Sequence, residues 1–225
     1  MTNSWIVNNY IDYLKTSFPK YFTSLSEDEL SALSELYFSV NDFFVLCSCL
    51  NKSEYERSNF LNLVNEFMSY ISRLLLVVPI NDKYLVDSIL RMLIEKLYRI
   101  LYAHYHSHLL EASIRKHERR KMSSRLIGKL NKKNELDNLY NEYSELIHHS
   151  NPTTTDLLNF RELSEINVGL IAYISEKVNI LKEIFIEDFF ISKVGEAELV
   201  LASKLRLKNQ LIKQTSERLE EASII

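Results

Sequence analysis

Hydrophobic residues recur at helical intervals along most of the chain. The clearest stripe follows Asn81 and Asp82, either of which can cap a helix, and contains Leu85, Ile89, Leu93, Leu97 and Leu101. A second stripe contains Ile166, Leu170, Ile174, Val178, Leu181, Phe185 and Phe189. Such a repeat gathers apolar side chains on one helix face, which must pack against other helices. The pattern therefore predicts long amphipathic helices in an all-α bundle.

Capping signals and breaks predict about eight helices. Ser26–Glu29 and Ser53–Glu56 are capping boxes, in which a Ser hydroxyl and a Glu three residues later bind each other's free amide. They would open helices that run to about Leu50 and Pro79, and Gly195 would precede one last helix. Further helix starts are expected at Asn3 or Ser4, at Glu135 and at Thr153–Asp156. We expect a single domain over 1–225, with N-terminal helices over 1–80, a core over about 82–192 and a C-terminal helix over 194–222.

The composition agrees with a helical protein and excludes several classes. The 225 residues are 46 % hydrophobic, which is too high for a disordered chain, and they include only 3 Gly and 3 Pro. Glycine-rich phosphate loops, dinucleotide-binding turns and hairpin-rich sandwiches need glycines that this chain lacks. The composition therefore favours long helices over sheets but names no function.

The cysteines and the apolar runs bear on the compartment. Cys47 and Cys49 would point apart on a helix, so we interpret them as small buried side chains in a reducing cytosol. The N-terminus lacks the pattern of a signal peptide. The most apolar run, 71–80, contains Arg73 and is far shorter than the roughly 20 residues that span a bilayer. We expect a soluble cytoplasmic protein without membrane contact.

The segment from Leu101 to Lys133 is strongly basic, with nine Lys and Arg against two acidic residues. Such a density of positive charge commonly binds nucleic-acid phosphates. The alternative is a solvated helix face balanced by the acidic C-terminal part or by a second subunit. The candidate nucleic-acid-binding residues are Arg115, Lys116, Arg119, Arg120, Lys121, Arg125 and Lys129.

Arg91 and Glu95 are the first candidates for chemistry. They are four residues apart in a helix, so they share a face, and Leu90 and Ile94 flank them. Charged groups near a core need partners, because lone buried charges are costly. The alternative is an ordinary exposed ion pair.

The second candidate group closes a later helix. Tyr140, Ser144 and His148 are spaced four apart, which places a phenol, a hydroxyl and an imidazole in a row on one face. Histidine can donate and accept protons near neutral pH. The alternative is that His148 or His149 only caps the last carbonyls. The basic segment lies between the two candidate helices and would border the same cleft.

An Arg91–Glu95 pair in a long helix, followed about fifty residues later by Tyr140, Ser144 and His148, resembles the HEPN superfamily. The resemblance covers about Asp82 to Leu181. The family consists of all-α bundles of prokaryotic defence and toxin systems, many of them dimeric ribonucleases that need no metal. Its usual signature is Arg, four to six residues, then His. Residues 141–143, where that Arg would precede His148, are not basic, and Arg91 is our candidate for a spatial substitute.

The resemblance implies an RNA-targeting protein, either a ribonuclease toxin or a defence effector, that forms a homodimer and meets a partner protein from the same operon. His148 would act as base or acid, Arg91 would neutralise the phosphate, Glu95 would orient a neighbour, and Ser144 with Tyr140 would donate hydrogen bonds. No cofactor or metal is expected, since His104 and His108 share a face without a third ligand. The alternative functions are a catalytically inactive HEPN-like binding module and a helical scaffold that meets an acidic partner.

Overall fold

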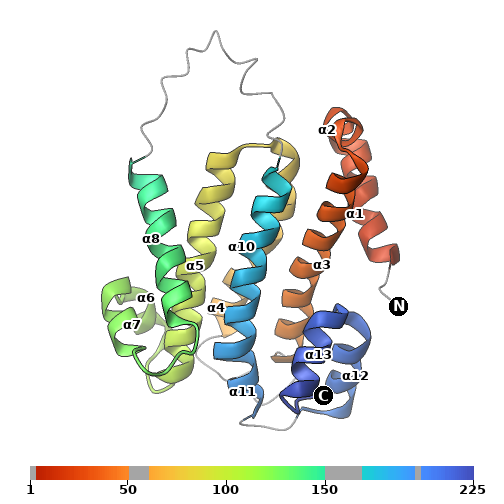
Figure 1. The fold of residues 1–225 in the computed structure, drawn as a ribbon. Helices are drawn as coiled ribbons and strands as arrows, with labels where there is room; N and C mark the ends of the chain where they lie inside the picture. Colours follow the sequence, from red (N-terminus) through yellow and green to blue (C-terminus); the bar gives the residue numbers. More distant parts are fainter. Residues whose placement is uncertain (1–3, 51–60, 150–168, 196–198) are drawn as a thin grey trace.

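The computed structural model describes residues 4–50, 61–149, 169–195 and 199–225, and these residues contain helices and no strand (Figure 1). The predicted all-α class is therefore confirmed. The α-helices are α1 Ser4–Ser17, α2 Pro19–Ser24, α3 Glu27–Leu50, α4 Leu61–Val77, α5 Lys83–Tyr105, α6 Glu111–Lys116, α7 Arg119–Arg125, α8 Lys133–His149, α10 Leu170–Phe185, α11 Ile191–Gly195, α12 Leu201–Gln210 and α13 Lys213–Glu221. A 3-10 turn, Val78–Ile80, joins α4 to α5, and a π-helical turn, η4 Ile186–Phe190, joins α10 to α11.

The long helices α3, α4, α5, α8 and α10 pack side by side around one hydrophobic core (Figure 1). Phe43 of α3, Phe67 of α4 and Phe185 of α10 meet at its centre, with ring centroids 5.2 to 5.9 Å apart. All three rings are fully buried. The core continues without a break from Tyr10 in α1 to Ile224 near the C-terminus. The apolar stripes of the sequence are therefore the faces that hold the bundle together.

Two predicted helix starts are confirmed by their hydrogen bonds. The amide of Ser26 donates to Oε2 of Glu29 at 2.9 Å, and the amide of Glu29 donates back to Oγ of Ser26 at 3.2 Å. Oδ1 of Asp82 accepts from the amide of Leu85 at 3.0 Å and caps α5. These three bonds satisfy amides that have no partner inside the helix. The expected caps at Ser53–Glu56 and Thr153–Asp156 lie outside the described residues.

The expected number of about eight helices is too low. Residues 4–17 form α1 and residues 19–24 form α2, because Pro19 begins a second helix where the first one ends. The basic segment forms the short helices α6 and α7.

The single C-terminal helix expected over 194–222 is also wrong, because the chain breaks between α12 and α13. Leu211 and Ile212 are extended there, which frees the amide of Ile212 to donate to Oδ1 of buried Asp42 at 3.1 Å. Thr215 is buried beside it and donates to Oδ2 of Asp42 at 2.6 Å. A straight helix would use the Ile212 amide internally and leave Asp42 without it.

Two segments are long and apolar enough to cross a membrane, namely Glu27–Leu50 and Leu61–Ile80. The sequence expectation missed them because it considered only uninterrupted apolar runs. Within the bundle, 61 % and 44 % of their most apolar windows are buried against other parts of the protein. Core helices show the same length and composition, so the two segments are weak evidence for a membrane protein. Cys47 and Cys49 are buried in α3 and form no disulfide.

Candidate functional site

Arg91 connects α5 to α8 through Tyr140. The Cζ atom of Arg91 lies 3.8 Å from the centroid of the Tyr140 ring, and Nη2 of Arg91 donates a hydrogen bond to the Tyr140 hydroxyl. Nη1 of Arg91 lies 3.7 Å from Oε2 of Glu95, so the expected ion pair forms. The Arg91 side chain is only 14 % exposed. Its guanidinium is therefore held between helices rather than presented to solvent.

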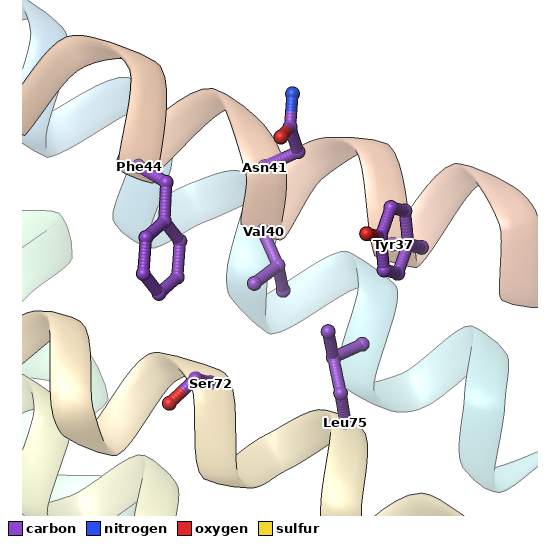
Figure 2. A pocket seen from close by; sticks show the side chains of 6 residues that line it. All are labelled: Tyr37, Val40, Asn41, Phe44, Ser72 and Leu75. Carbon is purple, nitrogen blue, oxygen red and sulfur yellow. The ribbon is translucent and has the colours of Figure 1, made fainter. Parts of the chain in front are cut away.

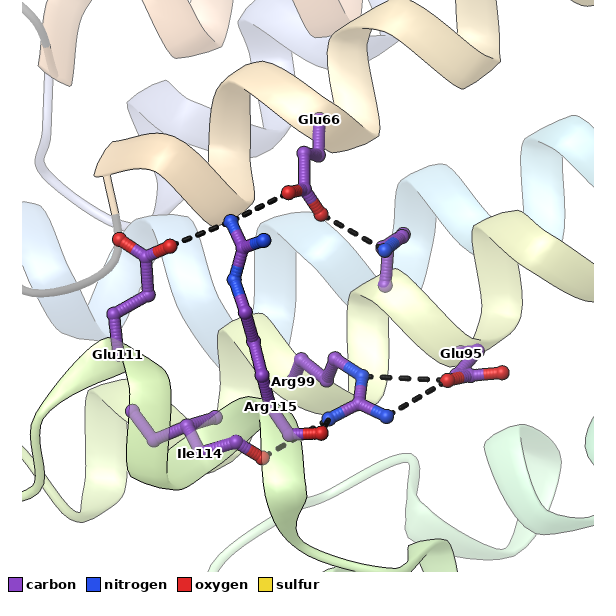
Figure 3. Close-up of polar contacts among 7 residues, drawn as sticks. Glu66, Glu95, Arg99, Glu111, Ile114 and Arg115 are labelled. Carbon is purple, nitrogen blue, oxygen red and sulfur yellow. Dashed lines mark hydrogen bonds and ion pairs between the residues drawn. The ribbon is translucent and has the colours of Figure 1, made fainter.

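Glu95 is bound more closely by a residue that the sequence analysis did not select. Oε1 of Glu95 accepts from Nη2 of Arg99 at 2.8 Å and from Nε at 3.3 Å (Figure 3). Nη1 of Arg99 also donates to the backbone oxygens of Ile114 and Arg115, at 2.9 and 2.8 Å (Figure 3). Arg99 thus ties the end of α6 to α5, and the carboxylate of Glu95 orients Arg99.

Ser144 and His148 lie farther along α8, away from Arg91. Ser144 is half-buried one turn beyond Tyr140, and the side chain of His148 lies outside the described residues. From Tyr140 to His148 the helix rises about 12 Å, at about 1.5 Å per residue. α5 and α8 are antiparallel, so this part of α8 faces the residues of α5 that precede Arg91 (Figure 1). The structure therefore brings Arg91, Glu95 and Tyr140 together. Ser144 and His148 lie farther along α8, in turns that run beside the start of α5.

A buried polar cluster lies in the part of the bundle near the start of α5. The hydroxyls of Tyr143 and Tyr173 are 2.6 Å apart, and the Tyr173 hydroxyl donates to Oδ1 of Asp87 at 2.8 Å. Nζ of Lys83 donates to Oδ2 of Asp87 at 2.7 Å. Burial is the main cause that raises the pKa of both tyrosines, so both phenols stay neutral. No sequence pattern predicts this cluster, because its members come from three helices that only the fold brings together.

The basic segment forms a lobe, residues 111–129 with α6 and α7, beside the start of α8 (Figure 1). His149, by contrast, ends α8 at the opposite end of the bundle (Figure 1). The basic segment and the end of α8 therefore do not lie beside each other, as a shared cleft would require. We call residues 111–129 the α6–α7 lobe.

The seven basic candidates fall into two groups. Arg115 and Arg119 are engaged: Nη2 of Arg115 lies 2.5 Å from both Glu66 and Glu111 (Figure 3), and Nη2 of Arg119 donates to Asn141 at 2.8 Å. Arg119 also lies over the Tyr140 ring, at 4.1 Å from the centroid. Lys116, Arg120, Lys121, Arg125 and Lys129 are exposed, as is Arg115, and Nη1 of Arg125 donates to the Tyr102 hydroxyl at 2.7 Å.

Asp137 of α8 holds the lobe to the bundle. It accepts hydrogen bonds from Tyr98, Ser123 and Lys133, and Arg119 lies 3.8 Å away. Burial disfavours the carboxylate, but the hydrogen bonds from Lys133, Tyr98 and Ser123 outweigh it and lower the pKa of Asp137. Asp137 is therefore a charged anchor for α7.

The start of α8 has a second carboxylate partner. Asp188 of η4 is buried and accepts from the amides of Asn131 and Lys132 at 2.7 and 3.0 Å. Burial raises the pKa of Asp188 against the opposing effect of these two amides. A carboxylate at a helix start binds free amides and the positive end of the helix dipole.

His104 lies in the last turn of α5 and His108 lies beyond the helix end at Tyr105, so the two do not share the helix face that their spacing predicts. His104 is buried, with Nε2 2.9 Å from Oγ of Ser192 in α11, while His108 is exposed. Among the described residues no group of three or more His, Cys, Asp or Glu could hold a metal ion. Arg99 precedes His104 by four intervening residues and His106 by six, whereas no basic residue stands at this spacing before His148 or His149. In the fold Arg99 donates to backbone oxygens of Ile114 and Arg115 at the end of α6, and His104 contacts Ser192 of α11.

A pocket of about 320 Å³ lies between α3 and α4, lined by Tyr37, Val40, Asn41, Phe44, Ser72 and Leu75 (Figure 2). Its lining contains no charged side chain. The pocket lies between helices that are not part of the α6–α7 lobe. Its uncharged lining supplies no cation that could bind a phosphate.

Comparison with protein-family models, with curated proteins and with solved structures gave no match. Function is therefore inferred from the residues and their geometry.

Proposed function

We propose that the protein is a HEPN-like RNA-targeting protein that contacts the RNA backbone through the α6–α7 lobe. The observation that carries the proposal is the outward set of cations on this lobe, Lys116, Arg120, Lys121, Arg125 and Lys129. Within the described residues, Lys116, Arg120 and Lys121 have no ion-pair partner. Cations that acidic neighbours do not neutralise are available for phosphate groups.

The choice of RNA rests on the HEPN resemblance. The positive charge by itself supports binding of either RNA or DNA. Each neutralised phosphate of a single strand steepens the dependence of log affinity on log salt by about 0.7. Three to five contacts would therefore give a slope of roughly −2 to −3.5.

Fluorescence anisotropy with a labelled single-stranded RNA, measured over a range of salt, tests the proposal. We expect the triple variant Lys116→Gln, Arg120→Gln, Lys121→Gln to reduce the slope by about 2 and the affinity at low salt by at least about tenfold. The matched control is Lys20→Gln, Lys208→Gln, Lys213→Gln, which removes three exposed charges from α2, α12 and α13. Equal loss of affinity in both triple variants would contradict a specific role for the lobe.

The second candidate function is a metal-independent ribonuclease that uses Arg91, Glu95, Ser144 and His148. The contact between Arg91 and Tyr140 supports part of this group, although Ser144 and His148 lie one and two turns farther along α8. Total RNA integrity after induced expression in bacteria separates the candidates. Cleavage that His148→Ala and Arg91→Ala both abolish supports the nuclease, and intact RNA with the wild type supports a catalytically inactive binding module.

We also infer that the protein is cytoplasmic and forms a homodimer. We expect it to bind a partner protein of a defence or toxin operon and to use no cofactor. The apolar faces of α3 and α4 pack in the core, and the exposed apolar side chains Val200, Leu201 and Leu205 on and before α12 offer a contact surface. Light scattering after size exclusion should give twice the chain mass of 26.5 kDa. A mass of one chain at micromolar concentration would contradict the dimer.

A further inference from the structure

The pocket between α3 and α4 has the size and the lining of a site for a small molecule. Its volume is about 320 Å³. An apolar cavity of about 150 Å³ is large enough to hold one benzene molecule. The pocket therefore has room for a ring system larger than benzene. Its lining comes from α3 and α4 alone, with Tyr37, Val40, Asn41 and Phe44 from α3 and Ser72 and Leu75 from α4 (Figure 2).

The pocket is short, and its inner part is apolar. The lining spans two turns of α3 and one turn of α4, which correspond to about 10 Å and about 5 Å along the two helices. Val40, which is 2 % exposed, points from α3 toward α4, and Leu75 points back from α4 (Figure 2). Ser72 leaves the space open, because its side chain is small. These dimensions fit one small molecule, whereas a docking helix needs a groove of roughly two to three turns on both sides.

The first helix holds both walls of the pocket in place. Tyr10 of α1 is buried, and its ring stacks on the Tyr37 ring with the centroids 5.4 Å apart. The Tyr10 hydroxyl donates a hydrogen bond to the backbone oxygen of Leu75 at 2.7 Å. One side chain thus contacts α3 and α4 at once. A preformed pocket of this kind does not have to be ordered when a ligand enters, which favours binding.

The polar groups of the pocket define the chemistry of the ligand. Burial raises the pKa of Tyr37, so its phenol stays neutral and can donate a hydrogen bond. Within the described residues the Tyr37 hydroxyl has no hydrogen-bond partner. Ser72 already donates to the backbone oxygen of Ser69 at 3.0 Å, and the Asn41 amide points away from α4 (Figure 2). Since no lining side chain is charged, the ligand should be neutral and apolar and should accept one hydrogen bond.

We propose that the α3–α4 pocket binds a neutral aromatic molecule of two fused rings, with a carbonyl oxygen that accepts a hydrogen bond from Tyr37. The rings pack against Val40, Phe44 and Leu75. Burial of the aromatic surface supplies most of the affinity, and the Tyr37 hydroxyl fixes the orientation of the ligand. The site is independent of the proposed RNA binding, because none of its residues belongs to the α6–α7 lobe.

Two probes separate the hydrogen bond from the apolar contact. Coumarin has two fused rings and a carbonyl, and indene is a hydrocarbon of similar size without an acceptor. Binding of each probe to the full chain is measured by NMR titration. We expect a dissociation constant of about 1 mM or lower for coumarin. Tyr37→Phe should weaken coumarin about three- to tenfold, because one hydrogen bond is lost, and should leave indene within about twofold.

A second variant closes the pocket. Ser72→Phe should fill the space and weaken both probes at least about tenfold. Ser31→Phe is the matched control, because Ser31 is exposed on α3 outside the pocket, and this variant should bind both probes as the wild type does. Circular dichroism shows whether each variant is folded. If Ser72→Phe fails to fold, the comparison of coumarin with indene on Tyr37→Phe decides alone.

Three results overturn the inference. The first is a dissociation constant of coumarin for the wild type that is higher than about 1 mM. The second is equal affinity of coumarin for the folded variants Ser72→Phe and Ser31→Phe, which would place the probe elsewhere on the protein. The third is a loss of affinity on Tyr37→Phe that is the same for both probes or absent for coumarin.

Discussion

Nζ of Lys182 lies 3.3 Å from Oδ2 of Asp42, and both side chains are almost completely buried. The pair joins α10 to α3, and Oδ2 of Asp42 also accepts the Thr215 hydroxyl of α13. Burial raises the pKa of Asp42, while Lys182 and the hydrogen bonds of Thr215 and Ile212 oppose the shift. Charge in the core is therefore balanced across three helices.

Asp42→Ala should lower the free energy of unfolding by about 3–5 kcal/mol, because it leaves Lys182 buried without a counter-charge. The double variant Asp42→Leu, Lys182→Met should lose less than the sum of the two single variants. Urea denaturation followed by circular dichroism measures both. Additive losses would show that the two charges do not depend on each other.

The stability that Asp137 contributes should depend on pH. Its pKa is lowered in the folded state, so its contribution is complete above the unfolded pKa of about 3.9 and is lost as the pH falls through the lowered value. Asp137→Asn should therefore be less stable than wild type by about 1–2 kcal/mol at pH 7. The difference should shrink as the pH falls from about 4 to about 2 in urea titrations. A constant difference over this range would refute the charged anchor.

Tyr140 should stabilise the attachment of α7, since Arg91 and Arg119 both lie over its ring. Tyr140→Leu removes these contacts and the hydroxyl that accepts from Arg91, with an expected loss of about 1–3 kcal/mol. Tyr84→Leu is the matched control, because Tyr84 is 59 % exposed. Its effect should stay within about 0.5 kcal/mol. Thermal unfolding of the two variants compares them directly, and equal melting temperatures would contradict the role of Tyr140.

The thiols of Cys47 and Cys49 should be inert in the native protein. Both are almost completely buried, and burial raises the pKa of Cys47. A thiol reagent should label them at least about 1000-fold more slowly than in denaturant, because labelling requires opening of the core. Fast native labelling of two thiols would contradict the packing of α3.

The sequence predicts the parts of the fold that depend on neighbours along the chain. The Ser26–Glu29 capping box and the Asp82 cap are each formed within three residues, so their sequence signals are sufficient. The break before α13 depends on Asp42, 170 positions away. No local signal at Leu211 or Ile212 reveals it, although buried Thr215 interrupts the apolar pattern.

In the candidate site, too, the sequence predicts contacts within one helix but not contacts between helices. The spacing of Arg91 and Glu95 correctly predicts their ion pair, because both lie on one helix. Whether a basic residue points to solvent depends on acidic partners from other helices, as Glu66 shows for Arg115. The pairing of His117 with Arg125 needs the turn between α6 and α7, which composition does not specify.

The large sequence separation between Asp42 and its partners has a consequence for the order of folding. Its partners Lys182, Ile212 and Thr215 lie 140 to 173 positions away, whereas the contacts of Arg125 with His117 and Tyr102 span only 8 and 23. Closing a long loop costs more chain entropy and takes longer than closing a short one. The lobe should therefore gain its amide protection early in refolding, and α12 and α13 should dock last. A pulse of deuterium exchange during refolding would resolve the two stages in time.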